Sequence, residues 1–234
     1  MKDIVSTAMT GDQLRASVLC TLTTPETRRV VDDFHRLYYS MPGTWGLTHY
    51  RGLNVMKSPM DLWAMQDVLW TLKPSLVIET GTAFGGSALF YGDCLERNGR
   101  GTVLTIDLDV PQVTHPRVCF LGGSSLNPKV IACVAGVVQE STGPVVEVLD
   151  SDHGTAHVAA ELAAYADFVT VGSVLVVEDT NICGHPVERD WMGGTGPKEA
   201  VDAFLAQRPD FVREPILERS LLTFHPGGWL TRVA

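Results

Sequence analysis

Acidic residues end three of the apolar runs in this chain, and they have the types and positions that could do chemistry: Glu79, Asp150 and the pair Glu178-Asp179. In an open parallel sheet, ligands bind at the carboxyl ends of the strands. Carboxylates gathered at that edge repel one another unless a cation lies among them. We therefore expect a cofactor or metal site where these apolar runs end.

Asp150, Glu178 and Asp179 form the predicted metal site, because adjacent strand ends would bring their oxygens into one coordination sphere. Three carboxylates without a cysteine or a close pair of histidines favour a hard ion such as Mg²⁺, with water and substrate oxygens as further ligands. Asp152 is an alternative to Asp150. We prefer Asp150 because it ends the strand directly.

His153 and Asp150 are the predicted catalytic residues. His153 follows Asp150 by three positions on a short loop, so its imidazole should face the same cavity. An imidazole titrates near neutral pH and can take the proton of a hydroxyl whose pKa a metal has lowered. The alkoxide formed would attack an activated methyl group in line. We expect His157 only to pack or to cap a helix, and His185 to contact substrate.

A glycine-rich turn, Gly81–Gly86, lies between an apolar run and a predicted helix. Backbone N–H groups at such a turn receive an anion, and glycine lets a ligand approach closely. The register ExGxxxGG lacks the GxGxxG that a pyrophosphate needs. Its acid suits the cationic amino group of S-adenosylmethionine (SAM), which we favour over NAD.

Asp107, at the end of the next predicted strand, is placed to accept hydrogen bonds from both hydroxyls of a ribose. Ser124 and Ser125 follow the third strand, where an adenine would lie. The full set of predicted cofactor contacts is Glu79, Thr80, Gly81, Thr82, Gly85, Ser87, Asp107, Ser124, Ser125 and Asp150.

Strands and helices must alternate to position these residues. The predicted strands are 76–79, 103–107, 117–121, 145–150 and 174–179, and the predicted helices are 59–73, 87–97, 128–138, 157–165 and 198–207. Apolar strands alternating with helices indicate a parallel sheet that is covered on both faces. Two strand-like pieces around Pro226-Gly227-Gly228, within 220–233, predict an antiparallel hairpin. The prediction is an α/β, Rossmann-like class I methyltransferase fold with a seven-stranded, mostly parallel sheet.

The N-terminal part of the chain has a different character. Residues 1–40 are predicted to be helical, and an irregular aromatic segment follows. We predict that residues 1–58 form an extension, either a lid or an oligomer contact, and that 59–234 form the methyltransferase domain. Trp45 and Tyr50 in the aromatic segment would cover a substrate or simply pack.

Bulk properties exclude several classes of function. A length of 234 residues fits one long domain, and the net charge of −9 argues against nucleic acid or an anionic membrane as a partner. The longest apolar run, Val130–Val138, is far shorter than the roughly 20 residues of a membrane helix. Five cysteines without CxxC spacing predict mostly buried free thiols. We therefore expect a cytoplasmic protein that acts on a small molecule, and the long N-terminal helical region favours a homo-oligomer.

Several segments of the chain resemble the cephalosporin hydroxylase family, a branch of the SAM-dependent methyltransferases. The matching segments are KSPMDLW (57–63), LVIETGTAFGGSALF (76–90), VLDSDHGTAHVAAEL (148–162), SVLVVEDTNICGHPV (173–187), GPKEAVDAF (196–204) and LLTFHPGGWL (221–230). The resemblance covers about residues 40–234. Some relatives are Mg²⁺-dependent O-methyltransferases that act on sugars of secondary metabolites, as in antibiotic biosynthesis.

The resemblance also implies roles for single residues: the SAM loop in Glu79–Gly86, the ribose acid in Asp107, the metal triad in Asp150, Glu178 and Asp179, and the general base in His153. Catechol O-methyltransferase is similar at this place. It has a lysine at the position of His153, and its triad ends in Asp-Asn where this chain has Glu-Asp. A catechol preference is therefore not implied.

We predict a Mg²⁺-dependent SAM O-methyltransferase for a hydroxyl of a small molecule, a sugar or another secondary metabolite. One alternative is an NAD-dependent oxidoreductase, which would need the missing GxGxxG. Another is an accessory SAM-binding partner of an antibiotic-tailoring enzyme of the cephalosporin 7-hydroxylation or methoxylation type. A base beside a metal triad speaks against that second alternative, because a binding module needs neither.

Overall fold

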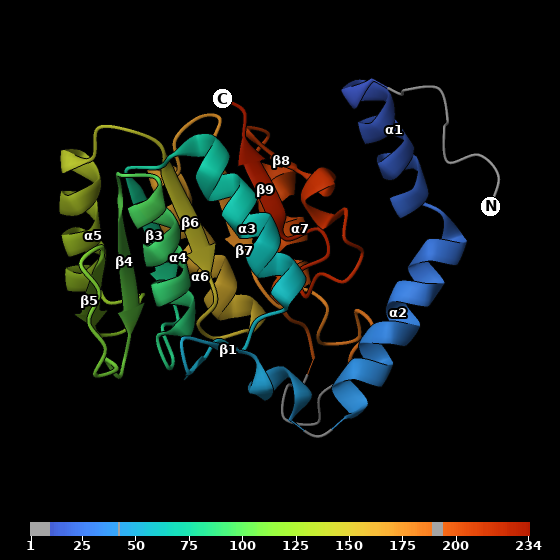
Figure 1. Cartoon of the computed structure of the whole chain (residues 1–234), viewed down its shortest axis with the longest axis horizontal. Helices are drawn as coiled ribbons and strands as arrows, with labels where there is room; N and C mark the ends of the chain where they lie inside the picture. The colour runs from blue at the N-terminus through green and yellow to red at the C-terminus, as the bar shows by residue number, and fades with distance from the viewer. Residues whose placement is uncertain (1–9, 42, 189–193) are drawn as a thin grey trace.

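A seven-stranded sheet forms the centre of the molecule in the computed structural model, which describes residues 10–41, 43–188 and 194–234 (Figure 1). The strand order is β5-β4-β3-β6-β7-β9-β8. Strands β3 to β7 run parallel, whereas β9 is antiparallel to both of its neighbours. The strands are β3 Leu76–Thr80, β4 Thr102–Asp107, β5 Val118–Gly122, β6 Val145–Leu149, β7 Val174–Val177, β8 Phe211–Arg213 and β9 Trp229–Arg232. The predicted α/β fold with a seven-stranded, mostly parallel sheet is confirmed.

Helices cover both faces of this sheet, as the apolar strands require. Alternate residues of a strand point to opposite faces. Ile78 of β3 therefore belongs to the core beneath α5, α6 and α7, whereas its neighbour Val77 belongs to the core beneath α3 and α4. The helices are α3 Pro59–Leu72, α4 Gly86–Arg97, α5 Pro128–Glu140, α6 Thr155–Tyr165 and α7 Pro197–Gln207.

The strand register brings the predicted site residues to one edge of the sheet. Thr80 pairs with Leu149, and Leu149 pairs with Val177, so the residues after these three strands are neighbours. The surroundings of position 81, at this edge of the sheet, require a glycine. Its φ of +87° favours glycine, and a Cβ there would collide with the backbone oxygen of Asp150.

Helices α1 Gly11–Leu22 and α2 Pro25–Ser40 lie along one side of the sheet domain (Figure 1). Arg15 of α1 forms an ion pair with Glu214, and Tyr38 and Tyr39 of α2 make ring contacts with Phe224. A short 3₁₀ helix, η1 Thr44–Leu47, and a small hairpin follow, in which β1 His49–Tyr50 pairs with β2 Leu53–Asn54. The described part of the predicted helical region is helical. The division into 1–58 and 59–234 stays a prediction.

The predicted antiparallel end of the sheet is confirmed, but its first strand is not the predicted one. Strand β9 pairs with β8, and the intervening segment contains the 3₁₀ helix η3 Pro215–Glu218. The predicted first piece, which precedes Pro226, does not enter the sheet because its backbone is bonded elsewhere. The carbonyl of Leu222 accepts a hydrogen bond from Ser58, and the N–H of Phe224 donates to Asp61.

The cysteines also differ from the prediction. All five are free, but Cys20, Cys119 and Cys133 are exposed, so the expectation of mostly buried thiols is wrong. Cys119 lies on the edge strand β5 and Cys133 on the helix α5, where one side faces solvent. Among the helices within the described ranges, none has the length and hydropathy that crossing a membrane requires. The cytoplasmic location stays a prediction.

Candidate functional site

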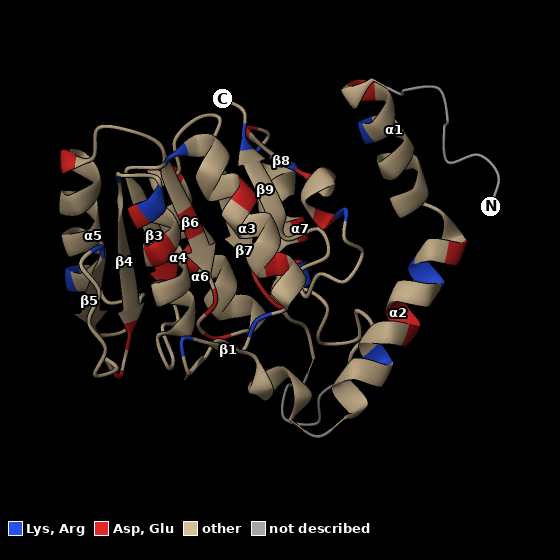
Figure 2. Cartoon of the chain, viewed as in Figure 1, with Lys and Arg blue, Asp and Glu red and all other residues tan. Residues whose placement is uncertain are grey.

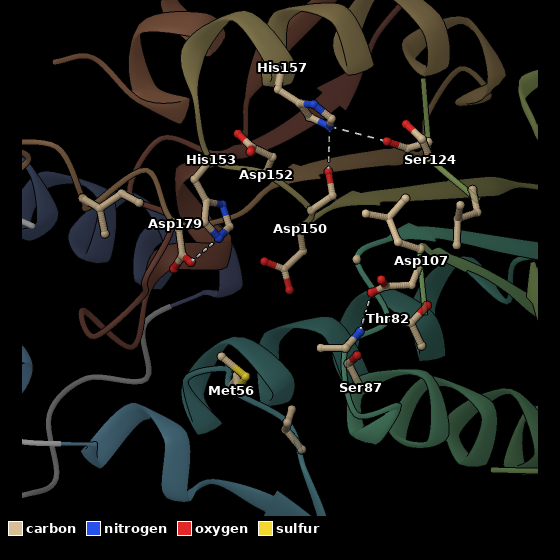
Figure 3. A pocket seen from close by; sticks show the side chains of 18 of the residues that line it. Met56, Thr82, Ser87, Asp107, Ser124, Asp150, Asp152, His153, His157 and Asp179 are labelled. Carbon is tan, nitrogen blue, oxygen red and sulfur yellow. Dashed lines mark hydrogen bonds and ion pairs between the residues drawn. The ribbon is translucent and has the colours of Figure 1, made fainter. Parts of the chain in front are cut away.

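A cavity of about 500 Å³ opens at the carboxyl edge of the parallel strands (Figure 3). The loops after β3, β4, β5, β6 and β7 each contribute to its wall, and the N-terminal segment closes one side with Tyr39 and Trp45. The predicted site residues that line it are Gly81, Thr82, Ser87, Asp107, Ser124, Ser125, Asp150, His153, Asp179 and Trp45. A single cavity thus brings together most of the predicted site residues.

Asp107 and the glycine-rich turn are joined on the wall of this cavity. The backbone N–H of Ala83 donates to Oδ2 of Asp107 at 2.8 Å, and Oδ1 accepts from the N–H of Asp109. Ala83 has a φ of +44°, in the left-handed region that is uncommon outside glycine. These bonds fix the carboxylate of Asp107 between the turn and the end of β4, where a ribose would meet it.

Glu79 lies behind the cavity wall. Its side chain is fully buried, and the Thr105 hydroxyl donates to its Oε2 at 2.6 Å. Burial raises the pKa of Glu79 to about 7, although attraction to Lys57 opposes the shift. Glu79, Thr80 and Gly85 are not part of the described lining, so the geometry gives them no direct contact with a ligand in the cavity.

A cluster of hydroxyls and one imidazole forms the end of the cavity near Ser124 and Ser125. Nε2 of His157 lies 3.0 Å from Oγ of Ser151 and 3.5 Å from Oγ of Ser125. Ser151 donates in turn to the buried carboxylate of Glu161 at 2.7 Å. No role was predicted for Ser151, and His157 was expected only to pack or to cap a helix. Both line the cavity, because Ser151 lies in the loop after β6 and His157 in the first turn of α6.

Asp150, His153 and Asp179 form a group that could hold a metal ion. One potential ligand atom of each lies within 4.8 Å of the others. Nε2 of His153 is 3.2 Å from Oδ2 of Asp179, and Figure 3 shows these side chains converging at one end of the cavity. Asp179 has a φ of +54°, a backbone conformation that is costly for a non-glycine residue and is concentrated at functional sites.

Glu178, the third predicted metal ligand, does not belong to this group. Its side chain is only 6% exposed, and its Oε1 accepts from Nζ of Lys57 at 2.6 Å. The same ammonium lies 2.5 Å from Oδ2 of Asp150, while the Lys57 side chain is 1% exposed. The carboxylate of Glu178 is therefore turned toward a buried cation.

Burial alone would lower the pKa of Lys57, but its attraction to Asp150 and Glu178 outweighs burial and raises that pKa well above its ordinary value. Lys57 is therefore charged at neutral pH. No role was predicted for Lys57. It precedes Asp150 by 93 positions and Glu178 by 121, so no local spacing could reveal the contact.

The three predicted substrate residues have different surroundings. Trp45 lines the cavity, together with Met56, for which no role was predicted. Tyr50 lies outside the lining, since its hydroxyl donates to Asp93 at 2.7 Å. His185 also lies outside it, with Nε2 2.5 Å from Oε1 of Glu199. Of the three, only Trp45 is placed to meet a substrate in the cavity.

The cavity is electronegative. Four aspartates line it (Asp107, Asp150, Asp152 and Asp179), and no lysine or arginine of the described residues does so. Figure 2 shows acidic residues at the carboxyl end of β4, where Asp107 lies. Such a wall attracts cations, and it repels phosphate groups.

Comparisons with known proteins agree with this picture. The family model "Rhamnosyl O-methyltransferase/CmcI" matches residues 43–233. The rhamnosyl O-methyltransferase of Mycobacterium tuberculosis (strain ATCC 25618 / H37Rv) is 37% identical over 211 residues, which cover 87% of this chain and 85% of that protein. The rhamnosyl O-methyltransferase of Mycobacterium leprae (strain TN) is 34% identical over 213 residues, which cover 88% of this chain and 92% of that protein.

Solved structures of CmcI resemble the chain as well. A CmcI structure with Mg and SAM superposes with a TM-score of 0.62 at 20% identity, covering 81% of this chain and 78% of that one. A CmcI structure with SAH gives a TM-score of 0.60 at 19% identity, covering 81% and 84%. At this level of identity the likeness shows a shared fold.

Proposed function

Because this chain belongs to the Rhamnosyl O-methyltransferase/CmcI family and has the class I methyltransferase fold, it is an O-methyltransferase, and we propose that it methylates a sugar hydroxyl of a neutral glycoside. The proposed methyl donor is SAM and the proposed metal is Mg²⁺. One observation carries the proposal: a single electronegative cavity contains a nucleoside-type carboxylate at one end and a metal-type group at the other.

The donor half of the cavity supports SAM. Asp107 presents a carboxylate to a ribose, and the hydroxyls of Ser124 and Ser125 lie on the wall near it. The absence of lysine and arginine from the described lining suits a cationic sulfonium and opposes the pyrophosphate of NAD. The geometry thus supports the choice of SAM that the glycine-rich turn suggested.

The donor atoms of the acidic group fit Mg²⁺. Carboxylate oxygens are the protein ligands that this ion prefers, and it usually keeps several positions for water or substrate. Asp150 and Asp179 would hold the ion directly, and Glu178 would add negative charge beside them. A divalent ion there supplies a Lewis acid that makes the acceptor hydroxyl more acidic.

His153 is the proposed general base. Its imidazole lies beside Asp179, whose carboxylate can orient the ring and stabilise the imidazolium that forms. His153 takes the hydroxyl proton, the acceptor oxygen forms a bond to the methyl carbon, and the bond from that carbon to sulfur breaks. The sulfonium becomes a neutral thioether, so the products are a methyl ether and S-adenosylhomocysteine.

The acceptor half of the cavity favours an uncharged sugar. Tyr39, Trp45 and Met56 offer apolar surfaces on which the C–H face of a sugar can lie. Asp152, which is not one of the proposed metal ligands, would repel a phosphate or a nucleotide diphosphate. The relatives are named rhamnosyl O-methyltransferases, so a rhamnosyl glycoside is the first acceptor to test.

The test measures S-adenosylhomocysteine release by the purified protein with SAM, Mg²⁺ and matched acceptors. We expect turnover with rhamnose carried on a neutral aryl or alkyl group, and little with the same sugar carried on a nucleotide diphosphate. Equal turnover with both acceptors would contradict the electrostatic argument. No turnover with any neutral glycoside would contradict the proposed function.

We also propose that the chain self-associates through its N-terminal helices. Helix α1 buries none of its side chains, and apolar residues of both helices are exposed, namely Leu14, Val30 and Leu37. Replacing these three by glutamate should shift the protein to a monomer in light scattering. A wild-type protein that is itself monomeric would contradict this part of the proposal.

A further inference from the structure

Lys57 is a cation built into the wall of the acidic site. It precedes Ser58, which caps α3 by accepting from the N–H of Met60 and donates to the carbonyl of Leu222. The backbone beside Lys57 is therefore fixed from two directions. Its side chain ends between the carboxylates of Asp150 and Glu178 at hydrogen-bonding distance from both.

One divalent cation would balance the charges of this cluster when its carboxylates are ionised and His153 is neutral. Ionised Asp150, Glu178 and Asp179 carry three negative charges, and Lys57 supplies one positive charge. Two negative charges remain in excess, which equals the charge of one divalent ion. Within the described residues, Lys57 is the one lysine or arginine that forms an ion pair with Asp150 or Glu178.

Solvent has little room beside Lys57. The small cavity lined by Lys57, Glu178, Asp61 and Tyr91 has a volume of about 10 Å³, close to the minimum for one water molecule. A buried carboxylate that loses its partner pays a large desolvation penalty. Without Lys57, therefore, a metal ion would be the natural remaining partner for Glu178 and Asp150.

We propose that Lys57 is a positioning residue that competes with the metal for Asp150 and Glu178, so that the metal-free site is stable and the metal stays exchangeable. This inference rests on the proposed metal site. The inference goes beyond that site, because it states that the charge of Lys57 weakens binding of the metal ion. The ammonium holds the two carboxylates when the ion is away and repels the ion when it arrives.

The first experiment measures Mn²⁺ binding by electron paramagnetic resonance without SAM, at about pH 8, above the ordinary range of carboxyl pKa values. We expect Lys57→Met to tighten Mn²⁺ binding by at least about tenfold, because a nearby positive charge is lost and Glu178 is released. Lys57→Arg keeps the charge and should bind Mn²⁺ like the wild type. Lys198→Met, which breaks a surface pair with Asp202, is the matched control and should change nothing.

The second experiment measures the melting temperature in EDTA and in saturating Mg²⁺. In EDTA, Lys57→Met should melt roughly 6–20 °C below the wild type, as expected when a buried ion pair is broken in a chain of this size. Mg²⁺ should restore most of that loss in the variant and shift the wild type far less. A lysine that served only to fill space would give a loss that Mg²⁺ does not repair.

The outcomes separate the inference from the function on which it rests. Equal or weaker Mn²⁺ binding by Lys57→Met, with no added Mg²⁺ dependence of melting, would overturn the role of Lys57. No Mn²⁺ binding by the wild type would instead remove the metal from the proposed function. If Lys57→Met does not fold, Mn²⁺ binding is measured on the double variant Lys57→Met/Glu178→Gln, which lacks both charges of the buried pair. A Mn²⁺ affinity of the double variant within a few-fold of the wild type supports competition between Lys57 and the metal, and a loss of Mn²⁺ binding overturns it.

Discussion

Two groups of the described residues have the composition of a metal site, and they differ in what surrounds them. Asp150, His153 and Asp179 form one group, and the other is Asp93, Glu96 and His115 on α4 and the loop before β5. Each has two carboxylates and one imidazole with ligand atoms within 4.8 Å of one another. Composition alone therefore does not distinguish them.

The second group is already engaged in holding the fold together. Asp93 accepts hydrogen bonds from the hydroxyl of Tyr50 at 2.7 Å and from Arg51 at 3.2 Å, and it lies 3.1 Å from Nε2 of His115. These contacts tie the small β1–β2 hairpin to α4. The first group instead opens into the cavity beside the cofactor wall. The set of donors is the same in both groups, so access to the cavity is what distinguishes the first group as the candidate metal site.

The largest expected effect is that of removing the metal. EDTA should reduce methyl transfer to the uncatalysed background, and Mg²⁺ should restore it, because the Lewis acid at Asp150 and Asp179 is lost and regained. Asp179→Asn should be nearly as inactive, whereas Asp93→Asn should keep its Mg²⁺-dependent turnover. The measurement is S-adenosylhomocysteine release. Full activity in the presence of chelator, or an equal loss of turnover in Asp179→Asn and Asp93→Asn, would contradict the proposal that the first group alone binds the catalytic metal.

The next effect concerns the two histidines. His153→Ala should cut turnover by roughly 10²–10⁴-fold, the range for a lost general base, with SAM affinity nearly unchanged. His115→Ala should leave turnover within about threefold of the wild type and lower stability instead, because it removes a buried partner of Asp93. Steady-state kinetics and calorimetric SAM titrations check both. Comparable losses of turnover in the two variants would contradict the assignment of a catalytic role to His153 and a structural role to His115.

The smallest effect is on folding at the second group. Burial opposes ionisation of Asp93, but hydrogen bonds from Tyr50 and His115 and the charge of Arg51 lower its pKa. Because the folded pKa is depressed, ionised Asp93 stabilises the fold above the unfolded pKa of about 3.9, and this stabilisation is lost as pH falls through the folded pKa. Asp93→Asn should therefore lose about 1–3 kcal/mol of unfolding free energy at neutral pH.

Urea unfolding at several pH values checks this prediction. The gap between the wild type and Asp93→Asn should begin to narrow below about pH 4 and close below the folded pKa of Asp93, where both side chains are neutral. A gap that stays constant down to the acid range would assign the loss to packing rather than to the ionised carboxylate. Turnover of the variant should not follow the same pH dependence, because Asp93 lies outside the cavity lining.

The strand ends were predictable because apolar runs and parallel register are local properties of the sequence. Asp107, Asp150 and Asp179 were found in this way, and all three line the cavity. The segment around Phe224 was mispredicted because its backbone partners, Ser58 among them, lie in a distant part of the chain.

Side-chain partners account for the other differences. Tyr50 and His185 looked available for substrate, but each has an acidic partner, Asp93 and Glu199, that the sequence pattern did not reveal. The contact between Lys57 and the site crosses from the start of α3 to the ends of β6 and β7. No periodicity predicts such contacts, because tertiary packing alone decides them.

Gly81 leaves no space between the glycine-rich turn and the backbone of Asp150 and Ser151. In the proposed reaction, the spacing between the donor side and the metal side of the cavity is consequently set by contact of main chain with main chain. Trp45 and Met56 line the same cavity but take no part in this contact. We therefore expect substitutions at these two positions to change the range of acceptors while the distance over which the methyl group is transferred stays the same.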